Sequence, residues 1–83
     1  MSVLVSKEQK RFEAFEANVE WFISNYKHLK KKYNLQYVAV NAGEVIDHDS
    51  DPDRLIARLR THYEDISTFV IEYVGDHDTQ LIL

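Results

Sequence analysis

Apolar side chains recur every three or four residues along the first third of the chain, the spacing of one face of an α-helix. The members of this stripe are Phe12, Phe15, Val19, Phe22, Tyr26, Leu29 and Tyr33. Ser6 followed by Gln9 forms a capping box, which predicts that the helix begins just after the serine. The stripe is typical of a helix packed on its own core, and its 3.5-residue period also allows a seam for self-association.

The predicted first helix is too long for a sheet of ordinary strands. At 1.5 Å per residue, a helix over residues 7–32 would be about 39 Å long, against about 17–20 Å for a strand. Helix propensity is weaker at Asn18 and at Ser24-Asn25. We therefore expect either a break at one of these points or a first half that packs away from the sheet.

Short β-branched and aromatic runs follow. Residues 36–40 (QYVAV) and 44–47 (EVID) flank a join containing Gly43, which predicts a β-hairpin. Residues 68–74 (TFVIEYV) and 79–83 (TQLIL) predict two further strands. Between the hairpin and the strand over residues 68–74, Asp51 and Pro52 suit the N-cap and first position of a second long helix. Its predicted buried face consists of Leu55, Ile56, Leu59 and Tyr63.

The order α-β-β-α-β-β predicts an α+β fold, a two-layer sandwich with a small, mostly antiparallel sheet and both helices on one face. We expect the strand order 2-1-3-4. Apolar residues fall on both sides of the predicted strands, so the second sheet face would be too apolar for water. We expect a protein partner or a second copy of the chain to cover it.

Eighty-three residues make a single domain, here an N-terminal helical extension over residues 1–17 and a core over residues 18–83. The chain contains no cysteine, which removes disulfides and thiolate chemistry and suits a reducing compartment. No apolar run is long enough for a signal peptide or a membrane span. We expect a cytoplasmic protein with no membrane partner.

Charge is distributed unevenly along the chain. Residues 1–41 carry a net charge of +3 and residues 42–83 a net charge of −7. The basic stretch KHLKKKY, near Tyr26, Tyr33 and Tyr37, is the one feature typical of a nucleic-acid binder. The sequence pI of about 5.4 lies far below the value typical of such binders, so we expect no nucleic-acid partner.

The tripeptide Asp-His-Asp occurs twice, at residues 47–49 and 76–78. Aspartate and histidine are Zn²⁺ or Mn²⁺ ligands, which makes His48, Asp49, His77 and Asp78 weak metal candidates. Both copies are also explained by turn chemistry, because aspartate side chains bond nearby backbone N–H groups. We therefore predict no metal, no cofactor and no catalytic residue; two glycines cannot build a phosphate loop, and no serine lies in a nucleophile elbow.

From about Asn18 to Leu83 the chain resembles a small prokaryotic, largely archaeal, domain family of unknown function. The shared segments are YKHLKKKY, YVAVNAGEVID, DSDPDRLIARLRTHYEDI, FVIEYV and LIL. The resemblance implies the same fold for this chain, and it supplies no catalytic residues.

The function predicted is that of a non-enzymatic interaction or regulatory domain acting by self-association or by binding a protein partner. The alternative is a small ligand- or metal-binding domain that uses the acidic His/Asp loops. Arg54 and Arg58 form a basic edge suited to an acidic partner segment. With the apolar candidates, the predicted interface residues are Phe12, Phe15, Val38, Val40, Arg54, Arg58, Val70 and Val74.

Overall fold

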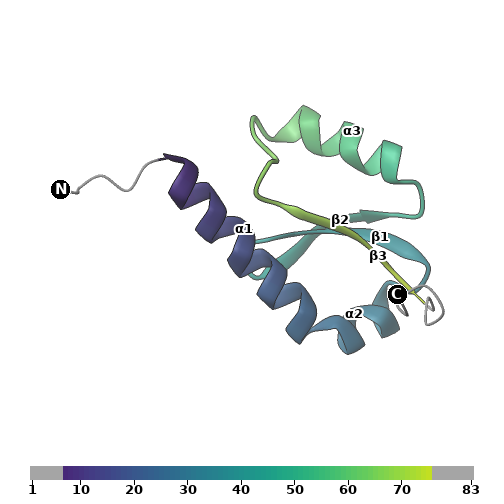
Figure 1. The fold of residues 1–83 in the computed structure, drawn as a ribbon. Coiled ribbons are helices and arrows are strands. Elements are labelled where there is room, and N and C mark those ends of the chain that lie inside the picture. Colours follow the sequence, from purple (N-terminus) through teal and green to yellow (C-terminus); the bar gives the residue numbers. More distant parts are fainter. Residues whose placement is uncertain (1–6, 76–83) are drawn as a thin grey trace, which may run out of the picture.

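The structure is a computed structural model that describes residues 7–75 (Figure 1). Its helices are α1 (Lys7–Ser24), α2 (Tyr26–Lys32) and α3 (Pro52–His62), and its strands are β1 (Gln36–Asn41), β2 (Glu44–Asp49) and β3 (Val70–Val74). The predicted α+β class is confirmed. The predicted strand over residues 79–83 and the Ser6 cap lie outside the described residues.

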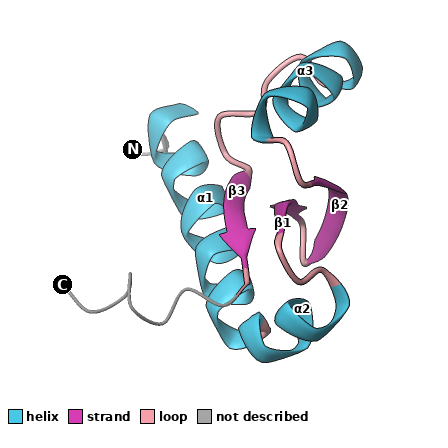
Figure 2. Ribbon diagram, turned by 90° about the vertical axis from the view of Figure 1, so that its right-hand side faces the viewer, coloured by secondary structure: helices cyan, strands magenta, loops and turns pink. Residues whose placement is uncertain are grey.

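The predicted long helix breaks at Asn25, one of the two expected positions. Asn25 has φ −108° and ψ 10°, and its side-chain amide donates to the Trp21 carbonyl at 2.8 Å. A side chain that bonds the preceding turn in this way competes with continuation of the helix. Consequently α2 turns sharply away from the direction of α1, as Figure 2 shows.

The described strands are ordered β2-β1-β3, as expected, and both outer strands run antiparallel to β1. A two-residue turn joins β1 to β2, with φ values of 52° at Ala42 and 75° at Gly43. Positive φ at both central residues defines a type I′ turn, whose twist matches that of the hairpin strands. The predicted hairpin is therefore confirmed.

The predicted placement of both helices on one sheet face is wrong. The α1 and α2 helices cover one face and α3 covers the other, so the sheet lies between two helical layers (Figure 1). Because both sheet faces are apolar, each requires a cover, and the chain supplies one helical unit for each. The expectation that a partner covers the second face is overturned by α3.

The core is correspondingly divided into two clusters. On the α1/α2 side the fully buried members are Leu29, Val38, Val40, Val70 and Val74, flanked by partly buried residues that include Val19, Phe22 and Tyr26. On the α3 side they are Ala39, Leu55, Leu59 and Phe69. The four valines predicted to form an interface, Val38, Val40, Val70 and Val74, are 0–4% exposed, so that prediction is wrong.

One buried polar side chain, Asn18, fastens α1 to the hairpin and to the chain before β3. Its amide nitrogen donates to the Asn41 side chain at 3.1 Å and to the Thr68 carbonyl at 2.8 Å. Its amide oxygen accepts from the Ala42 backbone N–H at 3.0 Å. Asn18 is 4% exposed and its hydrogen-bonding groups are satisfied, so it holds the positive-φ turn against the helix.

The first half of α1 extends past the sheet, as its length predicts (Figure 1). Phe12 is 63% exposed and Phe15 is 41% exposed, although both belong to the apolar stripe. On α3, Leu55 and Leu59 are buried as predicted, whereas Tyr63 is 40% exposed and stacks edge-on against Phe69. Across residues 7–75, no helix combines the length and apolar character that crossing a membrane requires.

Candidate functional site

The first Asp-His-Asp copy lies at the end of β2, and its three side chains do not share a face. Asp47 and Asp49 pair with Ala39 and Tyr37 of β1, on the α3 side of the sheet. His48 pairs with Val38, on the α1/α2 side. Alternation along a strand separates the imidazole from the two carboxylates.

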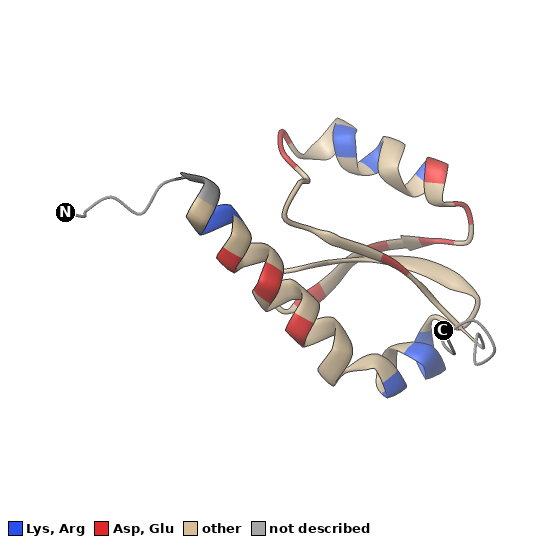
Figure 3. Cartoon of the chain, viewed as in Figure 1, with Lys and Arg blue, Asp and Glu red and all other residues tan. Residues whose placement is uncertain are grey.

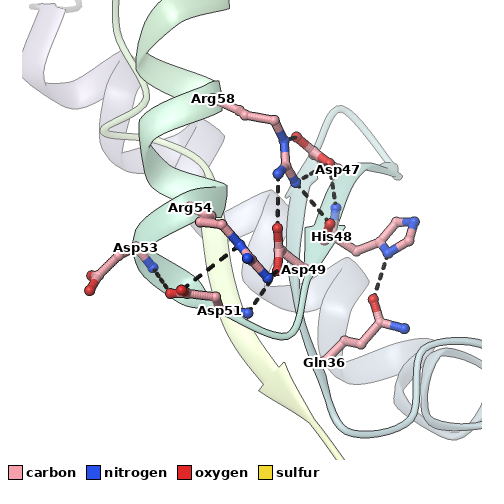
Figure 4. Close-up of polar contacts among 8 residues, drawn as sticks. All are labelled: Gln36, Asp47, His48, Asp49, Asp51, Asp53, Arg54 and Arg58. Atoms are coloured by element: carbon pink, nitrogen blue, oxygen red, sulfur yellow. Dashed lines mark hydrogen bonds and ion pairs between the residues drawn. The ribbon is translucent and has the colours of Figure 1, made fainter.

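Arg58 of α3 binds the carboxylates of both Asp47 and Asp49 (Figure 4). Its Nε and Nη2 donate to the two oxygens of Asp47 at 3.0 Å each, a bidentate pair. Its Nη1 donates to Asp49 at 2.8 Å, and Nη2 also donates to the His48 carbonyl at 3.0 Å. The planar guanidinium thereby satisfies two strand residues and one backbone acceptor from a single helix position.

Asp49 connects this pair to the start of α3. One of its oxygens accepts from the Asp51 backbone N–H at 2.8 Å and from Arg54 at 3.2 Å. Asp51 in turn accepts from the Asp53 backbone N–H at 2.9 Å, the predicted N-cap, with Pro52 opening the helix. The cluster therefore fixes both where α3 begins and how it lies on β2.

The electrostatics of the cluster favour ionised carboxylates. The Arg58 hydrogen bonds hold the pKa of Asp47 below its usual range, against a smaller opposing effect of burial. The Asp51 backbone N–H and then Arg58 lower the pKa of Asp49, and the two carboxylates raise the pKa of Arg58. Since Arg58 pairs with the carboxylates of both Asp47 and Asp49, the cluster joins a helix to a strand.

His48 makes separate contacts on the opposite face. Its Nδ1 lies 2.6 Å from the Gln36 side-chain oxygen, and its ring packs against Tyr33 with centroids 4.8 Å apart. His48 and Asp49 are therefore not brought together as metal ligands. His77 and Asp78 lie outside the described residues, and residues 7–75 contain no group of three or more potential ligands arranged for a metal.

Arg54 and Arg58, which were predicted as interface residues, form ion pairs within the chain. Arg58 binds Asp47 and Asp49, while Arg54 lies 3.2 Å from Asp49 and 3.8 Å from Asp51. Arg54 keeps 67% of its side chain exposed, so it retains some surface that another molecule can contact. The tyrosines near the basic stretch do not share one face: Tyr37 stacks on Tyr73 on the α3 side, whereas Tyr26 packs on the α1/α2 side and bonds the Gly75 carbonyl.

A groove runs between α1 and β3, which is an edge strand of the described sheet. Its volume is about 450 Å³, and its lining is mainly apolar: Phe15, Val19, Phe22, Ile23, Phe69, Val70, Ile71 and Glu72. Ile23 is 66% exposed and borders the groove on the side away from the sheet. Phe15 was predicted as an interface residue, whereas Ile23 was missed because it falls beside the regular stripe.

These features define a class of protein: a small α+β domain whose sheet faces are covered by its own helices, with three exposed large apolar side chains, Phe12, Phe15 and Ile23, on α1. The chain belongs to a family of unknown function (DUF5678), whose family model matches residues 28–75, more than half of the chain. The predicted resemblance to a family of unknown function is confirmed over those residues. The match contains the three described strands, α3 and most of α2, and it leaves α1 outside. Comparison with curated proteins and with solved structures gave no significant match.

Proposed function

We propose that the chain is a non-enzymatic interaction domain that binds a protein partner through α1 and the groove beside β3. The observation that carries the proposal is the exposure of Phe12, Phe15 and Ile23 on one helix of a domain that buries its valines well. Phe15 and Ile23 line the groove, and Phe12 lies one turn before Phe15 on the same helix. Contiguous exposed apolar side chains mark binding surfaces more often than single ones do. The edge of β3 adds backbone groups with which a partner segment can pair.

The position of α1 outside the family match supports this assignment. The matched residues already contain both sheet faces and α3, together with the contacts of Arg58 to Asp47 and Asp49. The α1 helix lies outside this matched part. Its second half covers the sheet, whereas its first half extends beyond it. A prokaryotic, cytoplasmic setting belongs to the same proposal, and the absence of cysteine from the sequence is consistent with it.

The alternative, a ligand- or metal-binding domain built on the acidic loops, has less support. In the first loop, Arg58 and Arg54 already occupy the carboxylates of Asp47 and Asp49. The lowered pKa values of these two aspartates arise from hydrogen bonds that fix α3 on β2: Arg58 for Asp47, and the Asp51 backbone N–H followed by Arg58 for Asp49. Structural contacts of this kind shift pKa values without a catalytic role. The groove, by contrast, offers one carboxylate, Glu72, among apolar side chains.

The test compares three baits, the wild type and two variants, in a pull-down from the native cell, followed by titration of any purified prey. A Phe12→Ser, Phe15→Ser and Ile23→Ser variant removes the exposed apolar surface. A Leu35→Asn variant is the matched control, because Leu35 is 55% exposed, is not among the residues that line the groove, and has a φ of 66° that asparagine tolerates.

We expect a prey that binds the wild type and the Leu35 variant with equal affinity and binds the triple variant at least about tenfold more weakly, since buried apolar anchors dominate interfaces. Circular dichroism verifies that the triple variant remains folded. Equal binding by all three baits would refute the groove as the binding surface.

A further inference from the structure

The outer surface of the α1/α2 layer carries two charged faces of opposite sign. Glu16 and Glu20 lie one turn apart on α1, and each is two residues from the buried Asn18. Lys27 and Lys31 lie one turn apart on α2, and each is two residues from the buried Leu29. A residue two positions away lies about 200° around a helix, so both pairs point away from the sheet.

Neither pair has an ion-pair partner within residues 7–75. The described ion pairs involve Arg11, Arg54 and Arg58 with aspartates, and all four side chains of the two faces are exposed. Like charges four residues apart destabilise a helix, and Glu13 adds a third acidic group to the α1 face. Each face therefore repels itself and would be stabilised by a surface of the opposite sign.

We propose that these faces form a dimer interface in which the acidic face of α1 (Glu13, Glu16, Glu20) binds the basic face of α2 (Lys27, Lys31) of a second copy. The two faces lie on adjacent helices of one layer, red and blue in Figure 3. The two copies are related by a two-fold axis that runs parallel to the helical layer and bisects the angle between α1 and α2. This axis stacks the two layers face to face. It places α2 of each copy against α1 of the other.

Spacing and shape make the surface complementary to itself. The two glutamates and the two lysines have the same four-residue spacing, about 6 Å along each helix, so both pairs align together. The surface lined by Lys27, Lys30, Lys31 and Asn34 forms an open depression of about 490 Å³. The two-fold axis repeats every contact, so one asymmetric arrangement yields twice the number of ion pairs.

A foreign partner is less favoured by this surface than a second copy. Another protein would need a basic and an acidic helix at the same angle and spacing, in the opposite order. A nucleic acid or an anionic membrane would suit Lys27 and Lys31 but would meet Glu16 and Glu20 with repulsion. The chain itself is the one molecule that carries the required arrangement by construction.

Charge reversal in two matched variants tests the proposal. One variant carries Glu16→Lys and Glu20→Lys, and the other carries Lys27→Glu and Lys31→Glu. Each variant keeps two like charges four residues apart at the reversed positions. Sedimentation velocity measures the mass of each variant alone and of the equimolar mixture, and an Arg60→Glu, Glu64→Lys variant alters exposed charges away from the layer as a control.

We expect the wild type and the control to dimerise at low salt, with a dissociation constant that rises at least about tenfold as the Debye length falls from about 30 Å at 0.01 M to about 3 Å at 1 M salt. Each reversed variant should be monomeric alone, and the mixture should restore a 1:1 dimer. Circular dichroism confirms that each variant is folded.

A wild-type chain that stays monomeric at low salt and millimolar concentration overturns the dimer, as does a mixture that does not associate. A reversed variant that dimerises alone assigns the contact to another surface and also overturns it. The inference goes beyond the proposed function, and the charge reversals leave Phe12, Phe15 and Ile23 unchanged. Loss of groove binding and loss of charge-dependent dimerisation are therefore separate results.

Discussion

The two long helices, α3 and α1, are attached to the same sheet by different means. Buried leucines fix α3 on its face, and Arg58 ties it to Asp47 and Asp49 at one end of β2. The attachment of α1 relies on partly buried Val19 and Phe22 and on the buried side chain of Asn18. The family match includes α3 and excludes α1. Packing and charge together thus hold α3 on the sheet, while α1 is attached over only part of its length.

The largest expected difference between the two helices comes from truncating an apolar side chain on each. Leu55→Ala removes a fully buried side chain and should lower the free energy of unfolding by about 2–5 kcal/mol. Phe12→Ala removes an exposed one and should change it by less than about 0.5 kcal/mol. Urea unfolding of the two variants measures both, and equal losses would mean that something covers Phe12 in solution.

Replacing Asn18 should lower the local stability of α1 more than that of α3. Asn18→Ala leaves the Ala42 N–H and the Thr68 carbonyl without their partner, which should cost about 1–3 kcal/mol. Asn34→Ala, at an exposed position, is the matched control and should be neutral. Hydrogen exchange should show α1 amides losing protection while α3 amides keep theirs. Uniform loss across both helices would instead mean that the domain opens as a single unit.

The smallest effect on stability is expected from removing the contacts of Arg58 with Asp47 and Asp49, and this effect depends on pH. Because the folded pKa values of Asp47 and Asp49 are lowered, their stabilisation is complete above the ordinary aspartate pKa of about 3.9. It is lost as the pH falls through the lowered folded values. Arg58→Met should therefore lower Tm by several degrees at pH 7, and its gap to the wild type should narrow below about pH 4. A gap that stays constant down to pH 2 would assign the effect to packing of the arginine stem.

Much of the fold could be predicted because local signals determined it. The turn at Gly43, the Asp51 cap followed by Pro52, and the break at Asn25 each rest on residues that are close in sequence. The face that each helix covers could not be predicted in this way. Both faces of the sheet are apolar, so the pattern of Val38 and Ala39 fits a helix on either side.

The candidate site could be predicted only in part, for a related reason. Phe12 and Phe15 were found because the length of the stripe exceeds that of the sheet. The role of Arg58 was missed, because its partners lie nine and eleven residues away on another element. The spacing of charges within α3 does not show which residues of β2 lie opposite Arg58, because that depends on how the chain passes from the strand to the helix.

The irregularity in the β1/β2 ladder has a consequence for how this hairpin tolerates changes in length. Val40 pairs with Val45 and Ala39 with Asp47, which leaves Ile46 as the extra residue of a bulge. Ile46 packs into the α3 cluster while the next residue, Asp47, reaches Arg58, so two consecutive side chains serve the same helix. Loss of Ile46 would restore a regular ladder with both aspartates still aligned. Loss of His48 would instead turn one aspartate to the opposite side of the sheet, away from the arginine that neutralises it.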